Sequence, residues 1–161
     1  MSVERVKNYL AGFGLSERVI TFDVSSATVD LAAQALKVSP CRIAKTLSFL
    51  TKSGCLIIVA AGDARVDNSK FKQLFGEKAR MLPHESVEEM TGHPVGGVCP
   101  FDLRENVRVY LDESLRRFDT VFPAAGTAQS AVEMNCSELE KASHALGWVD
   151  VCKDWQENAA D

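Results

Sequence analysis

The sequence lacks the long hydrophobic run, the Cys-x-x-Cys pair and the clustered histidines that mark several common classes of protein. No apolar stretch approaches the ~20 residues that are needed to cross a bilayer, so we expect no membrane partner. Five scattered cysteines and three separated histidines in 161 residues predict neither a disulfide framework nor a metal site. The amphipathic pattern begins at once, which predicts a cytoplasmic protein without a signal peptide.

The charge is unevenly distributed along the chain. The net charge of -4 argues against general nucleic-acid binding, and no DNA partner is expected. Residues 37–80, however, carry nine Lys or Arg and three acids, whereas the remainder has a net charge of -10. Such a segment can present a basic face to a polyanion, or it can simply form a solvated surface.

The hydrophobic pattern predicts one domain over residues 1–155 and a frayed tail at 156–161. Helices are expected near 3–13, 28–38, 68–75, 86–91 and 139–146, the fourth beginning with a capping box at Ser86-Val87-Glu88-Glu89. Strands are expected at 18–24, 43–50, 55–61, 107–112, 120–124, 131–134 and 148–152. This irregular order favours a mixed α/β (α+β) domain over a doubly wound one.

Lys45 interrupts an apolar strand face. In a strand, Ile43, Lys45, Leu47 and Phe49 share one side, and that side is the more hydrophobic one. An ammonium group there is costly unless it has a partner or faces a pocket. Lys45 is therefore a candidate for holding an anionic or polar ligand.

Two further segments combine unusual composition with a position between predicted elements. The segment from Thr91 to Phe101 holds three glycines and two prolines, so it can form a stiff loop that directs backbone amides at a carbonyl or an oxyanion. The segment from Phe122 to Met134 places small residues in a turn between two strands, which leaves room for a ligand. A structural turn and a tightly packed hairpin are the respective alternatives.

Three motifs occur in a recognisable order. Arg42-Ile43-Ala44-Lys45-Thr46-Leu47 follows a helix, Gly96-Gly97-Val98-Cys99-Pro100 follows Thr91-Gly92, and Ala125-Gly126 leads to Glu133-Met134. With these motifs, residues 3–152 resemble the YbaK/ProX-type aminoacyl-tRNA deacylases, which are related to the editing domain of bacterial prolyl-tRNA synthetases. The resemblance implies a mixed, curved β-sheet surrounded by helices, with a pocket between the sheet and the loops.

The resemblance also implies a function. It is trans-acting hydrolysis of the ester between tRNA, especially tRNA for proline, and a mischarged small amino acid, by positioning and oxyanion stabilisation. No metal, cofactor or covalent intermediate is expected; the implied partner is aminoacyl-tRNA, and an aminoacyl-tRNA synthetase is a further candidate. On this reading Lys45 contacts the terminal adenosine phosphate or the aminoacyl carbonyl.

The implied site residues fall into three groups. The catalytic pair is Lys45 and Gly97. The substrate-binding residues are Thr28, Leu47, His93, Gly96, Val98, Cys99, Pro100, Gly126, Ser130 and Ala131, and the tRNA-binding residues are Lys70, Lys72, Lys78 and Arg80. Some deacylases of this group carry an aspartate where this chain has Ala131, so one polar contact to the substrate is missing.

Two other functions fit the same residues. Cys99 with His93 or His84 could form a cysteine hydrolase, if a thiolate and a base meet. Alternatively, the domain could bind aminoacyl-tRNA or a partner without turnover, since Lys45 would serve binding as well as catalysis.

Overall fold

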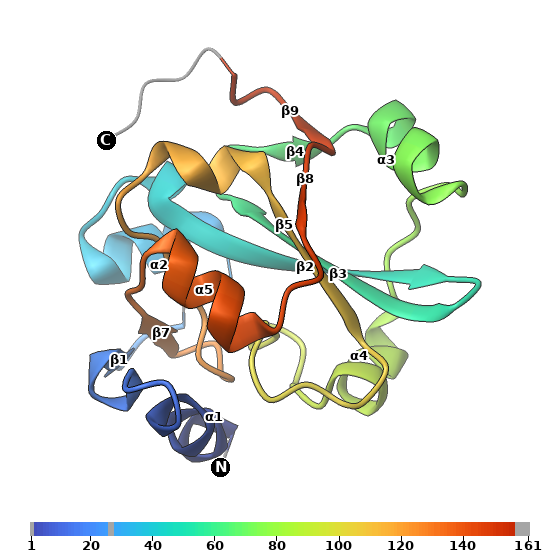
Figure 1. Ribbon diagram of the computed structural model, residues 1–161. Coiled ribbons are helices and arrows are strands. Elements are labelled where there is room, and N and C mark those ends of the chain that lie inside the picture. The colour runs from blue at the N-terminus through green and yellow to red at the C-terminus, as the bar shows by residue number, and fades with distance from the viewer. Residues whose placement is uncertain (1, 26–27, 157–161) are drawn as a thin grey trace.

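A mixed five-stranded sheet forms the centre of the protein. The computed structural model describes residues 2–25 and 28–156, and its main sheet has the order β6-β2-β3-β5-β8 (Figure 1). The strands are β2 (Ile43–Thr51), β3 (Gly54–Ala61), β5 (Arg108–Asp112), β6 (Phe122–Pro123) and β8 (Trp148–Val149). β2 and β3 pair antiparallel, whereas β6, β5 and β8 each run parallel to an inner neighbour. The predicted mixed α/β domain is confirmed.

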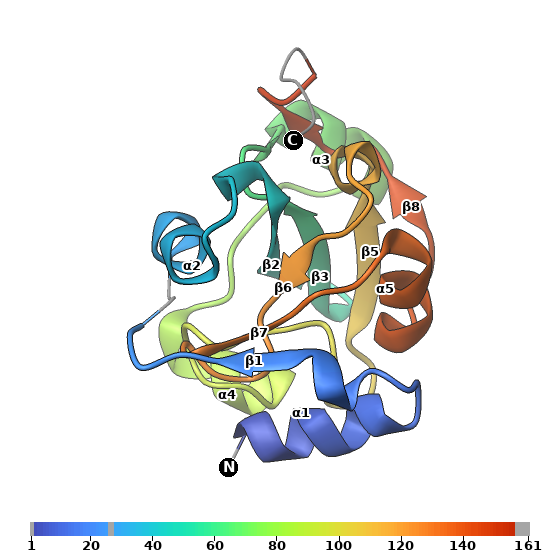
Figure 2. The ribbon, with the colours of Figure 1, turned by 90° about the vertical axis from the view of Figure 1, so that its left-hand side faces the viewer.

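Helices and two small sheets surround this centre. The α-helices of the described residues are α1 (Ser2–Ala11), α2 (Val29–Leu36), α3 (Asn68–Phe75), α4 (His84–Thr91) and α5 (Cys136–Ser143). The outer strands β1 (Val19–Thr21) and β7 (Ser130–Val132) pair with each other, as do β4 (Arg65–Val66) and β9 (Cys152–Lys153). Short 3-10 helices are η1 (Ser16–Arg18), η2 (Pro40–Arg42) and η3 (Glu113–Arg117). α2 and α5 lie on opposite sides of the main sheet, and α1, β1 and β7 close one end (Figure 2).

The core follows the predicted apolar pattern. Every residue of β3 from Cys55 to Ala61 is buried, because the inner strand of a sheet covered on both faces has no solvated side. α1 contributes Val6 and Leu10, both fully buried as their helical spacing predicts. The expected helix near 3–13 ends earlier, so Phe13 lies beyond the end of α1 and is 38% exposed.

Helix starts depend on local caps that the sequence shows only in part. The Thr28 hydroxyl accepts a hydrogen bond from the N–H of Leu31 and caps α2, so Thr28 precedes the helix that was expected to begin with it. The expected capping box at Ser86 is wrong, since α4 begins at His84 with Pro83 as its N-cap. A true capping box forms instead at α5, between Asn135 and Glu138.

Several predicted strands are shorter or divided. The range 18–24 contains only the three residues of β1, since η1 occupies its start. The range 148–152 supplies β8 to the main sheet and the first residue of β9 to a different sheet. The predicted turn after Phe122 joins β6 of the main sheet to β7 of the small sheet. Beside these strands, Val121 and Met134 form an isolated antiparallel bridge. The last helix ends at Ser143, so Leu146 lies outside it.

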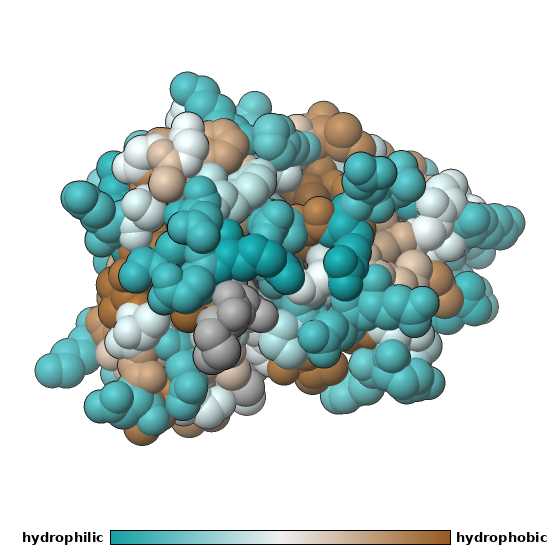
Figure 3. Space-filling model, turned by 90° about the horizontal axis from the view of Figure 1, so that it is seen from below, coloured by the Kyte–Doolittle hydropathy of each residue, from teal (hydrophilic) through white to brown (hydrophobic). Residues whose placement is uncertain are grey.

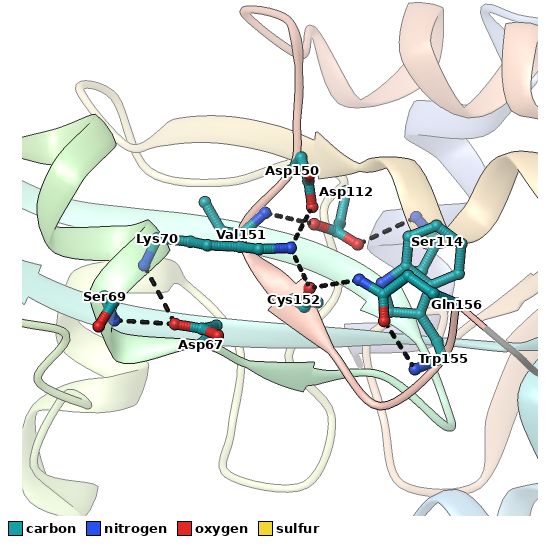
Figure 4. A network of polar contacts seen from close by, with 10 residues as sticks. All are labelled: Asp67, Ser69, Lys70, Asp112, Ser114, Asp150, Val151, Cys152, Trp155 and Gln156. Atoms are coloured by element: carbon teal, nitrogen blue, oxygen red, sulfur yellow. Dashed lines mark hydrogen bonds and ion pairs between the residues drawn. The ribbon is translucent and has the colours of Figure 1, made fainter.

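A polar network ties the C-terminal part of the described chain to the sheet (Figure 4). The buried Asp112 carboxylate accepts hydrogen bonds from the N–H groups of Ser114 and Val151, each at 3.0 Å. Lys70 on α3 donates to the Asp150 carboxylate and to the Cys152 carbonyl, each also at 3.0 Å. These contacts hold 150–152 against β5 and α3. Of the predicted tail, only Gln156 lies within the described residues.

The surface is mixed in character. On the side of α1 and α4, hydrophilic side chains surround smaller hydrophobic areas (Figure 3). Among the described residues no helix is long and apolar enough to cross a membrane.

Candidate functional site

A cavity of about 310 Å³ opens beside the start of β2. We call it the acyl cavity. Among the described residues that form its wall, Lys45 is the one charged residue. Its wall is formed by α2, β2, the 96–98 loop, β6 and the turn that leads into β7; the residues are Thr28, Val29, Ala32, Ile43, Ala44, Lys45, Thr46, Leu47, Gly96, Val98, Phe122, Ala124, Ser130 and Ala131.

The outer edge of β2 is unpaired where this cavity opens. β6 pairs with Ile43 and Ala44. Further along the same edge, the Ser48 carbonyl accepts from the N–H of Leu82, and Leu50 donates to the Arg80 carbonyl. Within the described chain no strand covers the residues between these two contacts. Because strand hydrogen bonds alternate in direction, the N–H of Thr46 points to the same open edge as those of Ser48 and Leu50.

The Thr46 side chain also suggests a missing partner. Its hydroxyl oxygen is buried and makes no hydrogen bond within the described residues. Buried hydroxyl groups are normally paired, so an orphan in the wall of a cavity points to a polar ligand. Thr46 was quoted in the strand motif but was not predicted as a site residue; the sequence contains no signal for an edge that later segments leave open.

Lys45 separates the acyl cavity from the turn after β3. Its ammonium group donates to the carbonyl oxygens of Ala64 and, at 3.4 Å, Gly62. Burial lowers the pKa of Lys45, and the positive charge of Arg65 acts in the same direction, whereas Asp63 opposes it. A carbonyl pair compensates the ammonium only in part. Lys45 thus remains suited to an additional oxygen ligand, as its strand position predicts.

Gly62 permits the turn that receives Lys45. A β-carbon at this position would lie 2.0 Å from the Pro40 carbonyl oxygen and 2.7 Å from Cγ1 of Val29. The turn therefore packs directly against η2 and α2, and any side chain would displace it. This close approach fixes the two carbonyl oxygens that hold the Lys45 ammonium group.

The glycine-rich loop is held against the turn before β7. A β-carbon on Gly97 would lie 2.7 Å from the Cα of Thr127 and 2.8 Å from the Gly126 carbonyl. On the other side of this contact, the Ser130 hydroxyl accepts from the N–H groups of Ala125 and Thr127 at 3.2 and 3.3 Å. The loop and the turn thus form one continuous wall. Gly97 and Gly126 do not line the cavity themselves but hold the lining residues Gly96 and Val98 in place.

The N–H of Gly97 is already used. It donates to the Pro94 carbonyl at 2.9 Å, although the resemblance implies a catalytic role for Gly97. The N–H groups of Gly96 and Val98, both in the cavity wall, have no backbone partner within the described residues. Oxyanion donation fits these two amides better.

His93 and Cys99 lie behind the loop, fully buried. His93 Nε2 lies 2.7 Å from the Phe101 carbonyl oxygen and 3.5 Å from the Cys99 sulfur. Arg5 donates to the Gly92 carbonyl at 2.7 Å and lies 3.3 Å from His93 Nδ1. This arrangement fits a neutral imidazole that donates from Nε2 and accepts at Nδ1.

Burial also sets the protonation of this pair. It lowers the pKa of His93 and raises the pKa of the Cys99 thiol to about 12. Cys99 is therefore a neutral thiol without access to solvent, and His84 lies exposed at the start of α4. Cys99 and His93, the two groups that a cysteine hydrolase would use, do lie side by side, but the neutral, buried thiol is unsuited to nucleophilic attack.

The structure brings most of the sequence-predicted residues together. Those in the wall of the acyl cavity are Thr28, Lys45, Leu47, Gly96, Val98, Ser130 and Ala131. Those that lie outside the wall are His93, Gly97, Cys99, Pro100 and Gly126. The predicted list missed the apolar floor from α2 and β6, for which the sequence gives no signal beyond ordinary core composition.

The four predicted tRNA contacts differ in their availability. Lys70 is engaged with Asp150 and Cys152. Lys72, Lys78 and Arg80 are exposed, and no acidic side chain pairs with them among the described residues. No group of three metal-ligating side chains occurs in the part of the chain that the structure describes.

The mixed domain thus presents a cavity with one half-buried lysine in its wall and two loop amides without a backbone partner in the described residues. Comparison with known proteins then gives the family. Residues 24–142 match the family described as "Aminoacyl-tRNA editing domain". The chain belongs to this family, as the three motifs predicted.

Individual relatives agree with this assignment. "Uncharacterized protein YwhH" of Bacillus subtilis (strain 168) is 50% identical over 157 residues, covering 97% of this chain and 100% of that protein. "Putative Cys-tRNA(Pro)/Cys-tRNA(Cys) deacylase EbsC" of Enterococcus faecalis is 27% identical over 109 residues, which is 66% of each protein. A crystal structure described as "a putative trans-editing enzyme for prolyl tRNA synthetase" superposes with a TM-score of 0.85 at 30% identity, covering 94% of this chain and 97% of that one.

Proposed function

We propose that this protein is a trans-acting deacylase that hydrolyses the ester between a small amino acid and tRNA. The observation that carries the proposal is the position of Lys45 at the open edge of β2. There an ammonium group, the Thr46 N–H and the free loop amides surround a cavity that is otherwise uncharged. Such a site can hold an aminoacyl carbonyl without a protein nucleophile.

The reaction needs little more than positioning. An aminoacyl ester is already activated, so a water molecule that attacks its carbonyl carbon requires a fixed geometry and a stabilised oxyanion. The N–H groups of Thr46, Gly96 and Val98 and the Lys45 ammonium supply donors for that oxyanion. The ester C–O bond then breaks, and the ribose oxygen leaves with a proton that derives from water.

The cavity wall leaves room for an aminoacyl group. Alanine and glycine residues line it from α2 (Ala32), β2 (Ala44), the loop (Gly96) and the turn before β7 (Ala124). We propose a small amino acid on tRNA for proline as the substrate, because the editing relatives are named for prolyl-tRNA synthetase and for Cys-tRNA(Pro). A transient association with a synthetase and a cytoplasmic location follow from the same proposal.

A non-catalytic aminoacyl-tRNA binding module is the second candidate, since the Lys45 ammonium has carbonyl partners and can serve as an anchor. A cysteine hydrolase is disfavoured by the full burial of Cys99.

A panel of tRNAs, each charged with alanine, cysteine, serine, threonine or proline, separates these candidates. We expect multiple turnovers of ester loss for at least one small amino acid on tRNA for proline, and slower loss from the cognate prolyl ester. Protection of the ester at stoichiometric protein would support the binding module. If the protein neither protects nor hydrolyses any ester of the panel, both candidate functions are refuted.

A further inference from the structure

The turn that receives the Lys45 ammonium group is itself held by an ion pair. The two carbonyls that accept from Lys45 belong to Gly62 and Ala64, so Asp63 lies between them in the chain. The Asp63 carboxylate accepts two hydrogen bonds from the Arg117 guanidinium, at 2.9 and 2.6 Å. The side chains of Arg117 and Asp63 are only 12% and 19% exposed. A bidentate pair with so little contact with solvent fixes the direction of both side chains.

The guanidinium of Arg117, the last residue of η3, is fixed from several sides. Its Nε donates to the Ser114 carbonyl at 2.9 Å. It also lies over the ring of Phe118, at 4.6 Å from the centroid, and over that of Trp155, at 5.1 Å. The same 3-10 helix is joined to the end of β3, because the N–H of Ala61 donates to the Ser114 hydroxyl at 3.1 Å. Arg117 therefore reaches the turn from a fixed base.

Three titratable side chains act on the Lys45 ammonium from the elements around it. Burial has the largest effect and lowers the pKa of Lys45; Asp63 in the turn opposes this shift, and Arg65 in β4 adds to it. Cys152 in β9 is a neutral thiol, because burial raises its pKa. Asp63 is thus the acidic group among the three, and its carboxylate is bound to Arg117. Without that partner, the carboxylate would be drawn to the ammonium.

We propose that Arg117 is a positioning residue for Lys45, which holds the Asp63 carboxylate away from the ammonium group and fixes the turn that receives it. This inference rests on the proposed function, because the ammonium is the group that would hold the aminoacyl carbonyl. Backbone carbonyls accept from an ammonium without neutralising it, whereas a carboxylate would compete with the substrate for its charge. Arg117 is not part of the acyl cavity wall as described, so it acts through Asp63 and the turn.

The titration of Lys45 tests this arrangement without any charged tRNA. The carbon-13 NMR signal of its Cε, assigned by its loss in Lys45→Met, reports the pKa. Arg117→Gln should raise the pKa of Lys45, because the Asp63 charge loses its partner and acts on the ammonium. The double variant Arg117→Gln with Asp63→Asn should lower it below that of the unaltered protein, because the carboxylate that favours the charged form is gone. Arg116→Gln is the matched control, since this neighbour in η3 pairs with Glu113 at the surface, and it should change nothing.

Activity should follow the same order. Arg117→Gln should lower kcat/KM about tenfold or more, since misplacing a group at the reacting carbonyl can cost about a hundredfold. Adding Asp63→Asn should restore part of that loss, because the competing carboxylate is removed. A pair with a merely structural role would lose at least as much in the double variant. Arg117→Lys keeps a positive charge opposite Asp63 and should lose less than Arg117→Gln.

An unchanged pKa of Lys45 in Arg117→Gln would overturn the proposal, as would equal losses of kcat/KM in the single and double variants. If Arg117→Gln does not fold, the double variant decides, since it leaves no unpaired charge behind; a Lys45 pKa equal to that of the unaltered protein would then remove the proposal. Because this titration requires no ester hydrolysis, its failure is distinct from failure of the charged-tRNA panel. Normal panel activity with an unresponsive Lys45 would leave the deacylase standing and exclude this role of Arg117.

Discussion

Gly97 packs so closely against Thr127 that a β-carbon on Gly97 would lie 2.7 Å from the Cα of Thr127. Because the neighbouring atoms are backbone, they cannot move aside as a flexible side chain would. This contact joins the glycine-rich loop to the turn before β7 and thereby fixes one wall of the acyl cavity. We infer a positioning role for Gly97, whose N–H already donates to the Pro94 carbonyl, in place of the catalytic role that the family resemblance implies.

Gly97→Ala should separate these two segments. We expect a loss of about 1–3 kcal/mol in the free energy of unfolding, as for other overpacked sites, and a larger fractional loss of kcat/KM. Urea denaturation and the deacylation assay measure the two effects. Gly147→Ala is the matched control, since a β-carbon there meets nothing within 4 Å. Full activity in Gly97→Ala would show that the loop does not shape the site.

Lys45→Met should abolish most deacylation while leaving the fold intact. The substitution keeps the methylene stem and removes an ammonium group whose burial is only partly compensated by two carbonyls. We expect kcat/KM to fall about 10²–10³-fold, the usual effect of losing one oxyanion donor. The free energy of unfolding should stay within about 1 kcal/mol of that of the unaltered protein. Lys52→Met, in the exposed turn after β2, should hydrolyse normally; normal hydrolysis by Lys45→Met would refute the mechanism.

Cys99→Ala distinguishes the deacylase from a cysteine hydrolase. Cys99 is a buried neutral thiol, with its pKa raised to about 12. Its removal should therefore lower the free energy of unfolding and leave the rate of ester hydrolysis unchanged. We expect about 1 kcal/mol of destabilisation from the small cavity and a kcat within twofold of the original. A loss of turnover beyond a hundredfold, in a variant that still unfolds cooperatively, would restore the nucleophile hypothesis.

Protonation of His93 should couple the stability of the fold to pH. Burial lowers the pKa of His93 in the folded state below the ordinary 6.5, so the unfolded chain binds more protons as the pH falls. The stabilisation is complete above pH 6.5 and is lost as the pH drops towards the folded pKa, by at most about 1.4 kcal/mol per pH unit.

His93→Gln supplies the reference for this effect. Urea denaturation between pH 7.5 and 5 should show a smaller decline for the variant, because glutamine does not titrate while the Arg5–Asp102 ion pair is retained in both proteins. Parallel declines in the two proteins would mean that His93 does not contribute to the pH dependence.

How much the sequence could predict depended on how local each signal was. The residue pattern around Lys45 is local, and the strand predicted at 43–50 is found as β2. The free edge at Thr46 depends on where β6 and the 80–82 segment stop, which no pattern within β2 encodes. Lys70 looked like an available cation because its partner Asp150 lies 80 residues away. Tertiary contacts, not propensity, decided these cases.

The basic segment gives the last test. Lys78 and Arg80 are exposed without acidic partners in the described chain, whereas Lys70 already neutralises Asp150. If the first two contact tRNA phosphates, Lys78→Gln with Arg80→Gln should weaken tRNA binding and reduce the slope of log K against log salt by roughly 0.7–0.9 for each lost contact.

Lys70→Gln serves as the contrast, because it removes one positive charge from α3, close in sequence to Lys78 and Arg80. We expect it to leave the salt slope unchanged and instead to lower stability, since Lys70 holds the 150–152 segment against α3. A filter-binding series across salt concentrations, with uncharged tRNA for proline, measures both slopes. An unchanged slope in the double variant would mean that Lys78 and Arg80 form ordinary solvated surface, because counterion release on binding must fall whenever a phosphate contact is removed.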